Sequence, residues 1–143
     1  MNQITWDDSY SVNNADIDAQ HKKWIEIHNK LDHILLNGSN DDVSNAVADT
    51  LQAMQDYVSY HFRAEEQYMN EINYPDLVAH RRLHTDFDDY LYSYKRKILS
   101  GELVLNSELM AILKKWLLNH IMREDQKYRD FLTRNQDVVK KQA

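Results

Sequence analysis

The chain lacks cysteine and contains only two glycines and one proline among its 143 residues. Without cysteine there are no disulfides, no thiolate nucleophiles and no iron–sulfur clusters, so any metal must be bound through nitrogen and oxygen. Average proteins contain about 7 % glycine and 5 % proline, and so few helix breakers predict long uninterrupted elements.

Basic surface and long apolar runs are missing as well. The net charge is −6, which argues against a nucleic-acid partner and against a membrane surface. No segment approaches 18 consecutive apolar residues, and the first ten residues, MNQITWDDSY, do not resemble a signal peptide. We therefore expect one domain of a cytoplasmic protein.

Four segments carry apolar residues at helical spacing, and the glycines and the proline fall between them. The expected helices span 19–36, 41–69, 77–98 and 108 to about 134, with Asp18 and Ser107 as candidate N-caps. Short connections predict an all-α fold, an up-down-up-down four-helix bundle. The first 16 residues, with Trp6 and Tyr10, are expected to form an N-terminal arm across it. Residues 1–135 would form the bundle domain and 136–143 a tail or linker.

Each expected helix places histidine on its apolar face. Two helices do so in pairs spaced i, i+4: His61 with Glu65, and His80 with His84. This spacing puts both side chains on one side of a helix, about 6 Å apart along the axis. A single histidine such as His21 or His120 is more often a satisfied core residue than a ligand. Its recurrence on all four helices favours a metal site.

Buried carboxylates without a counter-ion would destabilise the fold by several kcal/mol each, and a multivalent cation removes that cost. Imidazole and carboxylate ligands suit iron, manganese or zinc, but the number of histidines and acids exceeds what one tetrahedral zinc uses, so two metals are implied. The Glu-x-x-His pairs of di-iron oxidases and ferritins are absent. The nearest approach, Asp18 to His21, is better explained by Asp18 as an N-cap.

Four motifs surround these residues: IDAQHKKW at 17–24, HFRAEEQYM at 61–69, YPDLVAHRRLH at 74–84 and WLLNHIMRED at 116–125. In this order, over nearly the whole chain, they resemble the hemerythrin family in its bacterial form, the bacteriohemerythrins. The resemblance implies a non-haem di-iron centre: two iron ions (Fe2+/Fe3+) joined by an oxo or hydroxo bridge and by two carboxylates. The implied ligands are His21, His61, Glu65, His80, His84, His120 and Asp125.

Together, these ligands and the bridge fill all but one of the coordination positions that two octahedral irons offer. By the same resemblance, the iron held by His80, His84 and His120 is saturated, and the iron held by His21 and His61 receives O2. Reversible binding needs a water-poor pocket, and the apolar residues beside the ligands are Trp24, Trp116, Leu117 and Ile121. Trp24 stands where leucine is common in the family, and such a bulky side chain could narrow oxygen access or speed autoxidation.

The implied function is reversible O2 binding, as oxygen carrier, store or oxygen and redox sensor, with no catalytic residues. The alternative is a di-iron oxidase or a peroxide-handling enzyme, whose expected extra carboxylates are missing. We expect a monomer in isolation. If the chain is a fragment, its polar end from Asn135 onward would be a linker to a signalling domain.

The fourth helix leaves one choice open. Asp125 follows His120 by five residues, a rotation of about 140° beyond one turn, whereas Glu124 would lie only about 40° off. Spacing alone favours Glu124. The family motif places the bridging aspartate at Asp125, which could reach the site if the helix widens locally as a π-bulge.

Several neighbours are not expected to bind metal. His28 lies about 10 Å along the helix from His21 and should be a core residue or the partner of a ligand, and His33 should be exposed. Glu66 should be a solvated acid or the partner of a ligand. Tyr128 should either donate a hydrogen bond to a carboxylate or simply pack.

Overall fold

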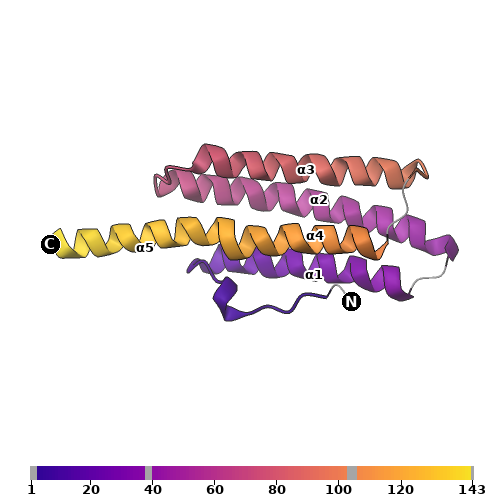
Figure 1. The fold of residues 1–143 in the computed structure, drawn as a ribbon, viewed down its shortest axis with the longest axis horizontal. Coiled ribbons are helices and arrows are strands. Elements are labelled where there is room, and N and C mark those ends of the chain that lie inside the picture. The colour runs from indigo at the N-terminus through magenta and orange to yellow at the C-terminus, as the bar shows by residue number, and fades with distance from the viewer. Residues whose placement is uncertain (1–2, 38–39, 103–105, 143) are drawn as a thin grey trace.

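The structure, a computed structural model, describes residues 3–37, 40–102 and 106–142 and contains no β-strand within these ranges. Its helices are η1 (Asp8–Tyr10), α1 (Ala15–Asn37), α2 (Asn40–Glu71), α3 (Leu77–Leu99), α4 (Ser107–Asn119), the π-helix η2 (His120–Glu124) and α5 (Asp125–Gln142). Successive long helices run in opposite directions side by side (Figure 1). The predicted all-α, up-down-up-down four-helix bundle is therefore confirmed.

The bundle interior consists of two apolar clusters. The larger includes Leu51 and Val58 of α2 and Leu91 of α3, and the smaller includes Met69 and Tyr128. The histidines predicted to bind metal lie in α1, α2, α3 and η2, and along α1, α2, α3 and the continuous helix α4–η2–α5 they fall between residues of the two clusters. The apolar packing therefore brackets one polar layer.

Helix α1 begins earlier than its predicted start. Asn14 Oδ1 accepts hydrogen bonds from the backbone N–H groups of Asp16 and Ile17, each at 3.1 Å. Asn14 is thus the N-cap, and the prediction that Asp18 has this role was wrong. Asp18 lies in the first turn and accepts a hydrogen bond from the backbone N–H of Val12 at 2.9 Å, which fastens the arm to the helix.

Helix α4 is capped by Asn106, whose side chain accepts a hydrogen bond from the backbone N–H of Leu109 at 2.9 Å. The predicted cap, Ser107, is instead the first helical residue. Asparagine and serine are about equally good N-caps, so two adjacent candidates cannot be ranked by residue type. The backbone conformation distinguishes them, because Asn106 is extended, as an N-cap residue is, whereas Ser107 is already helical.

The N-terminal arm packs across the bundle as predicted, with Ile4 buried and Trp6 and Tyr10 against the larger cluster. Ile4 and Asn29 exchange two hydrogen bonds of 2.8 Å each, and Lys22 Nζ lies 4.9 Å from the centre of the Trp6 ring. The arm turns at Asn13, whose φ of 59° is a left-handed conformation that asparagine tolerates better than most residues.

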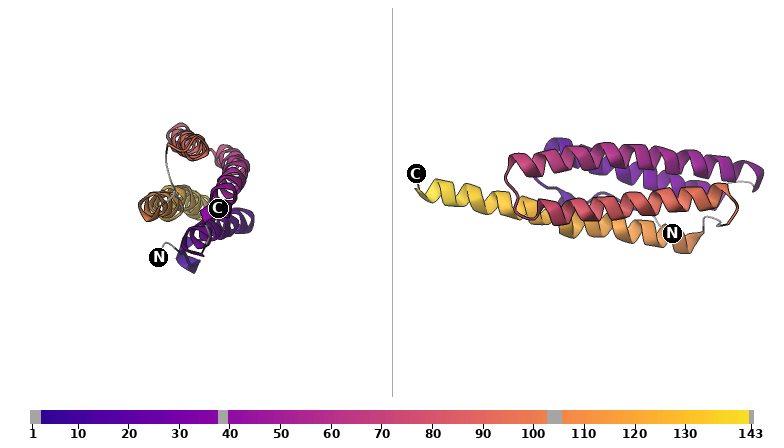
Figure 2. Two further views of the ribbon diagram at one scale, coloured as in Figure 1. Left: turned by 90° about the vertical axis from the view of Figure 1, so that its right-hand side faces the viewer. Right: turned by 90° about the horizontal axis from the view of Figure 1, so that it is seen from above.

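Helices α4, η2 and α5 form one continuous rod that extends past the other helices at its C-terminal end (Figures 1 and 2). The backbone of residues 136–142 thus continues α5. That these residues act as a tail or linker stays a prediction, as does the domain boundary at 135. None of the described helices is long and apolar enough to cross a membrane.

Replacing the cap of α1 tests the revised helix start. Asn14→Ala removes the acceptor for two backbone N–H groups and should lower the free energy of unfolding by about 0.5–2 kcal/mol, measured by urea denaturation. Asn70→Ala, at an exposed helical position of α2, is the control and should be neutral or slightly stabilising. Equal stability of Asn14→Ala and the wild type would contradict the assignment of the cap.

Candidate metal centre

Five histidines and two carboxylates meet in the polar layer between the apolar clusters. They are His21 of α1, His61 and Glu65 of α2, His80 and His84 of α3, His120 of η2 and Asp125 of α5. Each is at most 3 % exposed. Their ligand atoms form two groups, one of His21, His61, Glu65, His120 and Asp125, and one of Glu65, His80, His84 and His120, with atoms within 4.8 Å of one another in each. The structure therefore brings together all seven residues that the resemblance implied.

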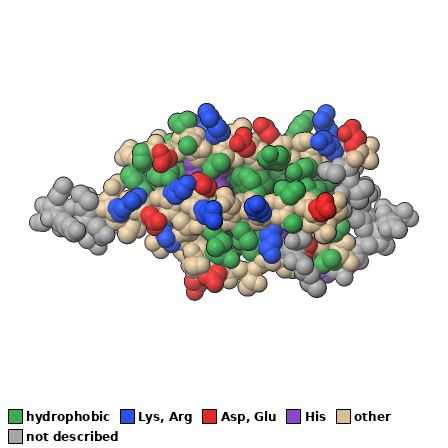
Figure 3. Space-filling view, in the orientation of Figure 1, with side chains coloured by type: hydrophobic (Ala, Val, Ile, Leu, Met, Phe, Trp, Pro, Cys, Tyr) green, Lys and Arg blue, Asp and Glu red, His purple; other side chains and the backbone are tan. Residues whose placement is uncertain are grey.

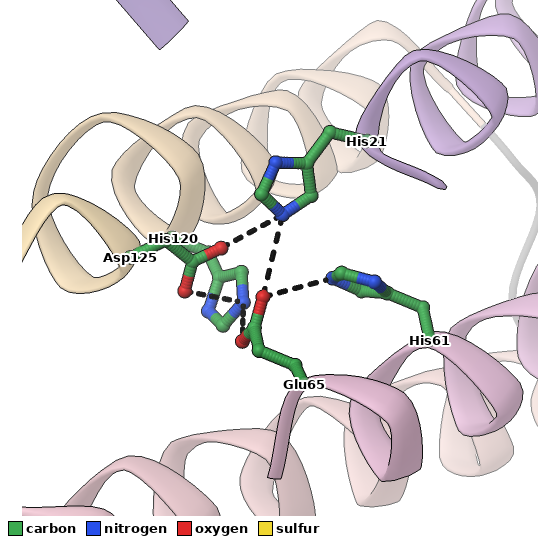
Figure 4. Close-up of side chains that lie close together, drawn as sticks. All are labelled: His21, His61, Glu65, His120 and Asp125. Carbon is green, nitrogen blue, oxygen red and sulfur yellow. Dashed lines mark hydrogen bonds and ion pairs between the residues drawn. The ribbon is translucent and has the colours of Figure 1, made fainter. Parts of the chain in front are cut away.

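Glu65 lies at the centre, and its two oxygens face different histidines. Oε1 lies 2.9 Å from Nε2 of both His80 and His84 and 3.1 Å from Nε2 of His120. Oε2 lies 3.2 Å from Nε2 of His61 and 3.4 Å from Nε2 of His21. One oxygen thus faces a three-histidine side, formed by His80, His84 and His120, and the other a two-histidine side, formed by His21 and His61. Figure 4 shows one Glu65 oxygen directed at His120 and the other at His21 and His61.

Asp125 repeats this division from the opposite helix. Its Oδ1 lies 3.0 Å from Nε2 of His80 and 3.1 Å from Nε2 of His120, both on the three-histidine side. Its Oδ2 lies 2.8 Å from Nε2 of His21, on the two-histidine side. Both carboxylates therefore span the same two sides.

Many of these short contacts are not hydrogen bonds. Both oxygens of Asp125 and Nε2 of His21 and His61 are buried and have no hydrogen-bond partner. Buried polar atoms are nearly always hydrogen-bonded, and exceptions require an explanation. Nitrogen and oxygen atoms that face a common centre at these distances fit a multivalent cation, which would accept their lone pairs together.

The electrostatics of the cluster also call for positive charge. Burial opposes protonation of His21 and His80, yet contacts with Asp125 and Glu65 outweigh it and raise the pKa of His21 to about 9 and that of His80 to about 10. Burial would raise the pKa of Glu65, but His120 and His61 hold it well below its usual range. The carboxylates stay ionised only beside positive charge, which protons or metal ions can supply.

The π-helix explains how Asp125 reaches the cluster. Across His120–Glu124 the helix widens, and the backbone N–H of Asp125 donates to the carbonyl of His120, five residues earlier. Asp125 then lies on the face of His120 and is fully buried. Glu124 points elsewhere and pairs with Lys127 at 3.1 Å. The geometry favours Asp125 over the residue that regular spacing suggested.

Side chains behind the cluster hold its members in place. His61 Nδ1 lies 2.8 Å from Gln20 Oε1, and His84 Nδ1 lies 3.0 Å from Glu66 Oε2. The Tyr128 hydroxyl donates to Glu65 Oε2 at 3.2 Å, one of the two roles expected for it. Glu66 partners a cluster histidine, also as expected, and Arg81 Nε donates to Glu66 Oε1 at 2.7 Å.

Gln20 and Arg81 were not identified from the sequence. Each contacts a residue on another helix, 41 and 15 positions away respectively. No spacing rule within one helix reveals such pairs. The other residues set aside behave as expected, because His28 is buried outside the cluster and His33 is exposed.

Apolar side chains cover the group of histidines and carboxylates on the side that faces the larger apolar cluster. Trp24, Leu117 and Ile121 are buried, and the Trp24 ring centre lies 5.9 Å from that of His61. Trp116 stacks on His120 with ring centres 5.1 Å apart.

Trp116 is only half-buried, because it also lines an outer cavity of about 580 Å³ between α3 and α4 together with Phe87, Tyr94 and Ile112. Figure 3 shows apolar side chains gathered on this face. Of the four residues predicted to form an oxygen pocket, three are enclosed and Trp116 is accessible from outside.

Comparison with known proteins identifies relatives over nearly the whole chain. Residues 12–132 match the family described as the hemerythrin HHE cation binding domain. A bacteriohemerythrin of Stenotrophomonas maltophilia (strain R551-3) is 34 % identical over 130 residues, covering 91 % of this chain and 82 % of the relative. A hemerythrin-like protein of Naegleria gruberi is 32 % identical over 129 residues, covering 90 % and 93 %. A wild-type hemerythrin crystal structure superposes with a TM-score of 0.81 at 29 % identity, covering 90 % of this chain and 97 % of that one.

Whether Asp125 or Glu124 binds the metal can be tested with a metal ion whose absorption spectrum changes on binding. Asp125→Asn should weaken the binding of cobalt(II), titrated optically, about tenfold or more, because it removes a charge from the centre of the cluster. Glu124→Gln is the matched control, one residue away, and should bind cobalt(II) as the wild type does. The reverse pattern would show that Glu124 is the ligand.

Proposed function

The chain belongs to the hemerythrin family, and on that premise we propose that its cluster holds two iron ions and binds O2 reversibly. The main support for the proposal is that the two oxygens of each carboxylate face opposite sides of the cluster. Glu65 and Asp125 each direct one oxygen toward His21 and the other toward His80 and His120. A single ion would need only one side.

The residues divide into two ligand sets. His80, His84 and His120 would hold one ion, and His21 and His61 the other, with the two carboxylates shared between them. When bound, a ferrous pair supplies the two electrons that O2 accepts on binding and returns on release. The side with two histidines has fewer protein ligands and so leaves room for O2.

The chain's own residues give the site the surroundings that reversible binding requires. Trp24, which lies beside His61 and His120, and Ile121 are fully buried and exclude water from the site. The Tyr128 hydroxyl donates a hydrogen bond to Glu65, and burial together with both carboxylates raises the pKa of this hydroxyl well above its usual value. Tyr128 therefore holds Glu65 in place without giving up its proton.

Carrier, store and sensor share this binding step, and one observation favours a sensor among them. Asp125 is the first residue of α5, a continuous helix that projects beyond the bundle (Figure 2). A small displacement of Asp125 when O2 binds would therefore be passed along α5 to residues outside the bundle.

Cycles of oxygenation test reversible binding directly. The protein is loaded with ferrous iron without air, exposed to O2 and then purged. We expect a visible charge-transfer band that appears with O2 and bleaches without it over repeated cycles. Irreversible oxidation in one step, or continuous O2 consumption in the presence of a reductant, would indicate an oxidase or a peroxide-handling enzyme instead.

Removing one ligand from the two-histidine side tests the division of the ligands. His61→Ala should abolish iron loading on that side, so that the iron content falls from two ions per chain toward one, measured by metal analysis after gel filtration. His33→Ala, which removes an exposed histidine, should retain two. Two irons in His61→Ala would refute the assignment.

A further inference from the structure

Two cluster histidines are held from behind by side chains of different charge. On the two-histidine side, Nδ1 of His61 lies 2.8 Å from the amide oxygen of Gln20. On the three-histidine side, Nδ1 of His84 lies 3.0 Å from a carboxylate oxygen of Glu66. The Nδ1 atoms of His21 and His120 are buried and have no hydrogen-bond partner. The two anchored histidines thus belong to different sides of the cluster.

Both anchors fix the same tautomer. An amide oxygen and a carboxylate oxygen can only accept hydrogen bonds, so Nδ1 of His61 and of His84 must carry the proton. This leaves Nε2 as the atom that faces the cluster, and in both residues Nε2 points at Glu65, at 3.2 Å from His61 and 2.9 Å from His84. The anchors therefore present both rings to the metal in the required form.

The anchors differ in how much electron density they give these rings. A carboxylate attracts the Nδ1 proton more strongly than an amide does, so it makes the imidazole a stronger electron donor through Nε2. Arg81 Nε donates to the other oxygen of Glu66 at 2.7 Å, so Glu66 forms an ion pair with Arg81 as well as anchoring His84. Glu66 is only 20 % exposed, which limits the screening of its charge by water, whereas Arg81, at 54 %, is largely in solvent.

We propose that Glu66 and Gln20 are positioning residues that make the two sides of the cluster electronically unequal. Glu66 strengthens His84 as a donor and stabilises the higher oxidation state of the ion on the three-histidine side. Gln20 leaves His61 a weaker donor, so the ion on the two-histidine side is easier to reduce. This inference rests on the proposed function, because it assigns unequal roles to the two ions that the function requires.

Two variants exchange the charges of the anchors with little change in size. Glu66→Gln makes the anchor of His84 neutral, and Gln20→Glu makes the anchor of His61 anionic. Changes in such partners of metal ligands typically alter metal affinity or activity by about 10–100-fold. A change of that size in the preference for ferric over ferrous iron corresponds to about 60–120 mV for one electron. Glu66→Gln should raise the midpoint potential on the three-histidine side, and Gln20→Glu should lower it on the two-histidine side.

The two one-electron midpoint potentials are measured by spectroelectrochemical titration of the iron-loaded protein. Asp56→Asn and Arg63→Gln change the charge of α2 at exposed positions and should leave both potentials unchanged. Arg81→Gln removes the competing donor to Glu66 and should shift the potential opposite to Glu66→Gln. A merely structural role for the anchors would reduce iron occupancy in both variants without shifts of opposite sign, and that result would overturn the inference.

A second measurement needs no iron. In metal-free protein labelled with ¹⁵N-histidine, the Nδ1 protons of His61 and His84 should exchange slowly and resonate downfield in NMR spectra. Glu66→Gln should move the His84 proton upfield and leave that of His61 in place, and Gln20→Glu should move the His61 proton further downfield. Protons that do not respond to these substitutions would overturn the inference whatever the iron content.

The outcomes separate the two proposals. If the wild type binds O2 reversibly but the potentials of both variants equal its own, the inference fails and the proposed function stands. If the potentials shift as expected but O2 does not bind reversibly, the proposed function fails and the inference stands. A wild type that takes up no iron would overturn both.

Discussion

Two fully buried carboxylates lie at the middle of the bundle. Most other features of the chain offset the energetic cost of burying their charge. Glu65 and Asp125 are fully buried, and an uncompensated buried carboxylate costs several kcal/mol. All five cluster histidines face Glu65, and His21, His80 and His120 also face Asp125. Because the proposed ligands come from all four long segments of the bundle, metal binding and the packing of the helices are expected to stabilise each other.

Within residues 3–37, 40–102 and 106–142, the π-helix at His120–Glu124 is the only departure from regular α-helix inside a long helical segment. A regular helix would carry Glu124 close to the face of His120 and turn Asp125 away. The wider turn reverses this, so the shorter acid enters the core and the longer one pairs with Lys127 at the surface. It also sets the rotation of α5 and so brings Tyr128 against Glu65. π-bulges are often found at functional sites, and here the bulge positions a proposed ligand.

The arrangement of helices and most of the cluster could be predicted from the sequence, because both follow from spacing within single helices. His61 and Glu65, like His80 and His84, share a helix face by their spacing alone. Asp125 could not be chosen this way, because the π-turn is invisible to regular spacing, and only the resemblance to a family indicated it. The caps Asn14 and Asn106 were missed because Asp18 and Ser107, which were predicted instead, are about equally good N-cap residues by type. Gln20 and Arg81 were missed because their contacts cross between helices, and only the packed bundle brings such residues together.

In the proposed centre, Glu65 and Asp125 each span two metal ions, with three histidines on one ion and two on the other. Crystallography of the iron-loaded protein with anomalous data at the iron absorption edge tests this most directly. We expect two anomalous peaks, with one oxygen of each carboxylate nearest to each peak and Glu124 remote from both. A single peak, or a second peak bound by Glu124 in place of Asp125, would contradict this arrangement.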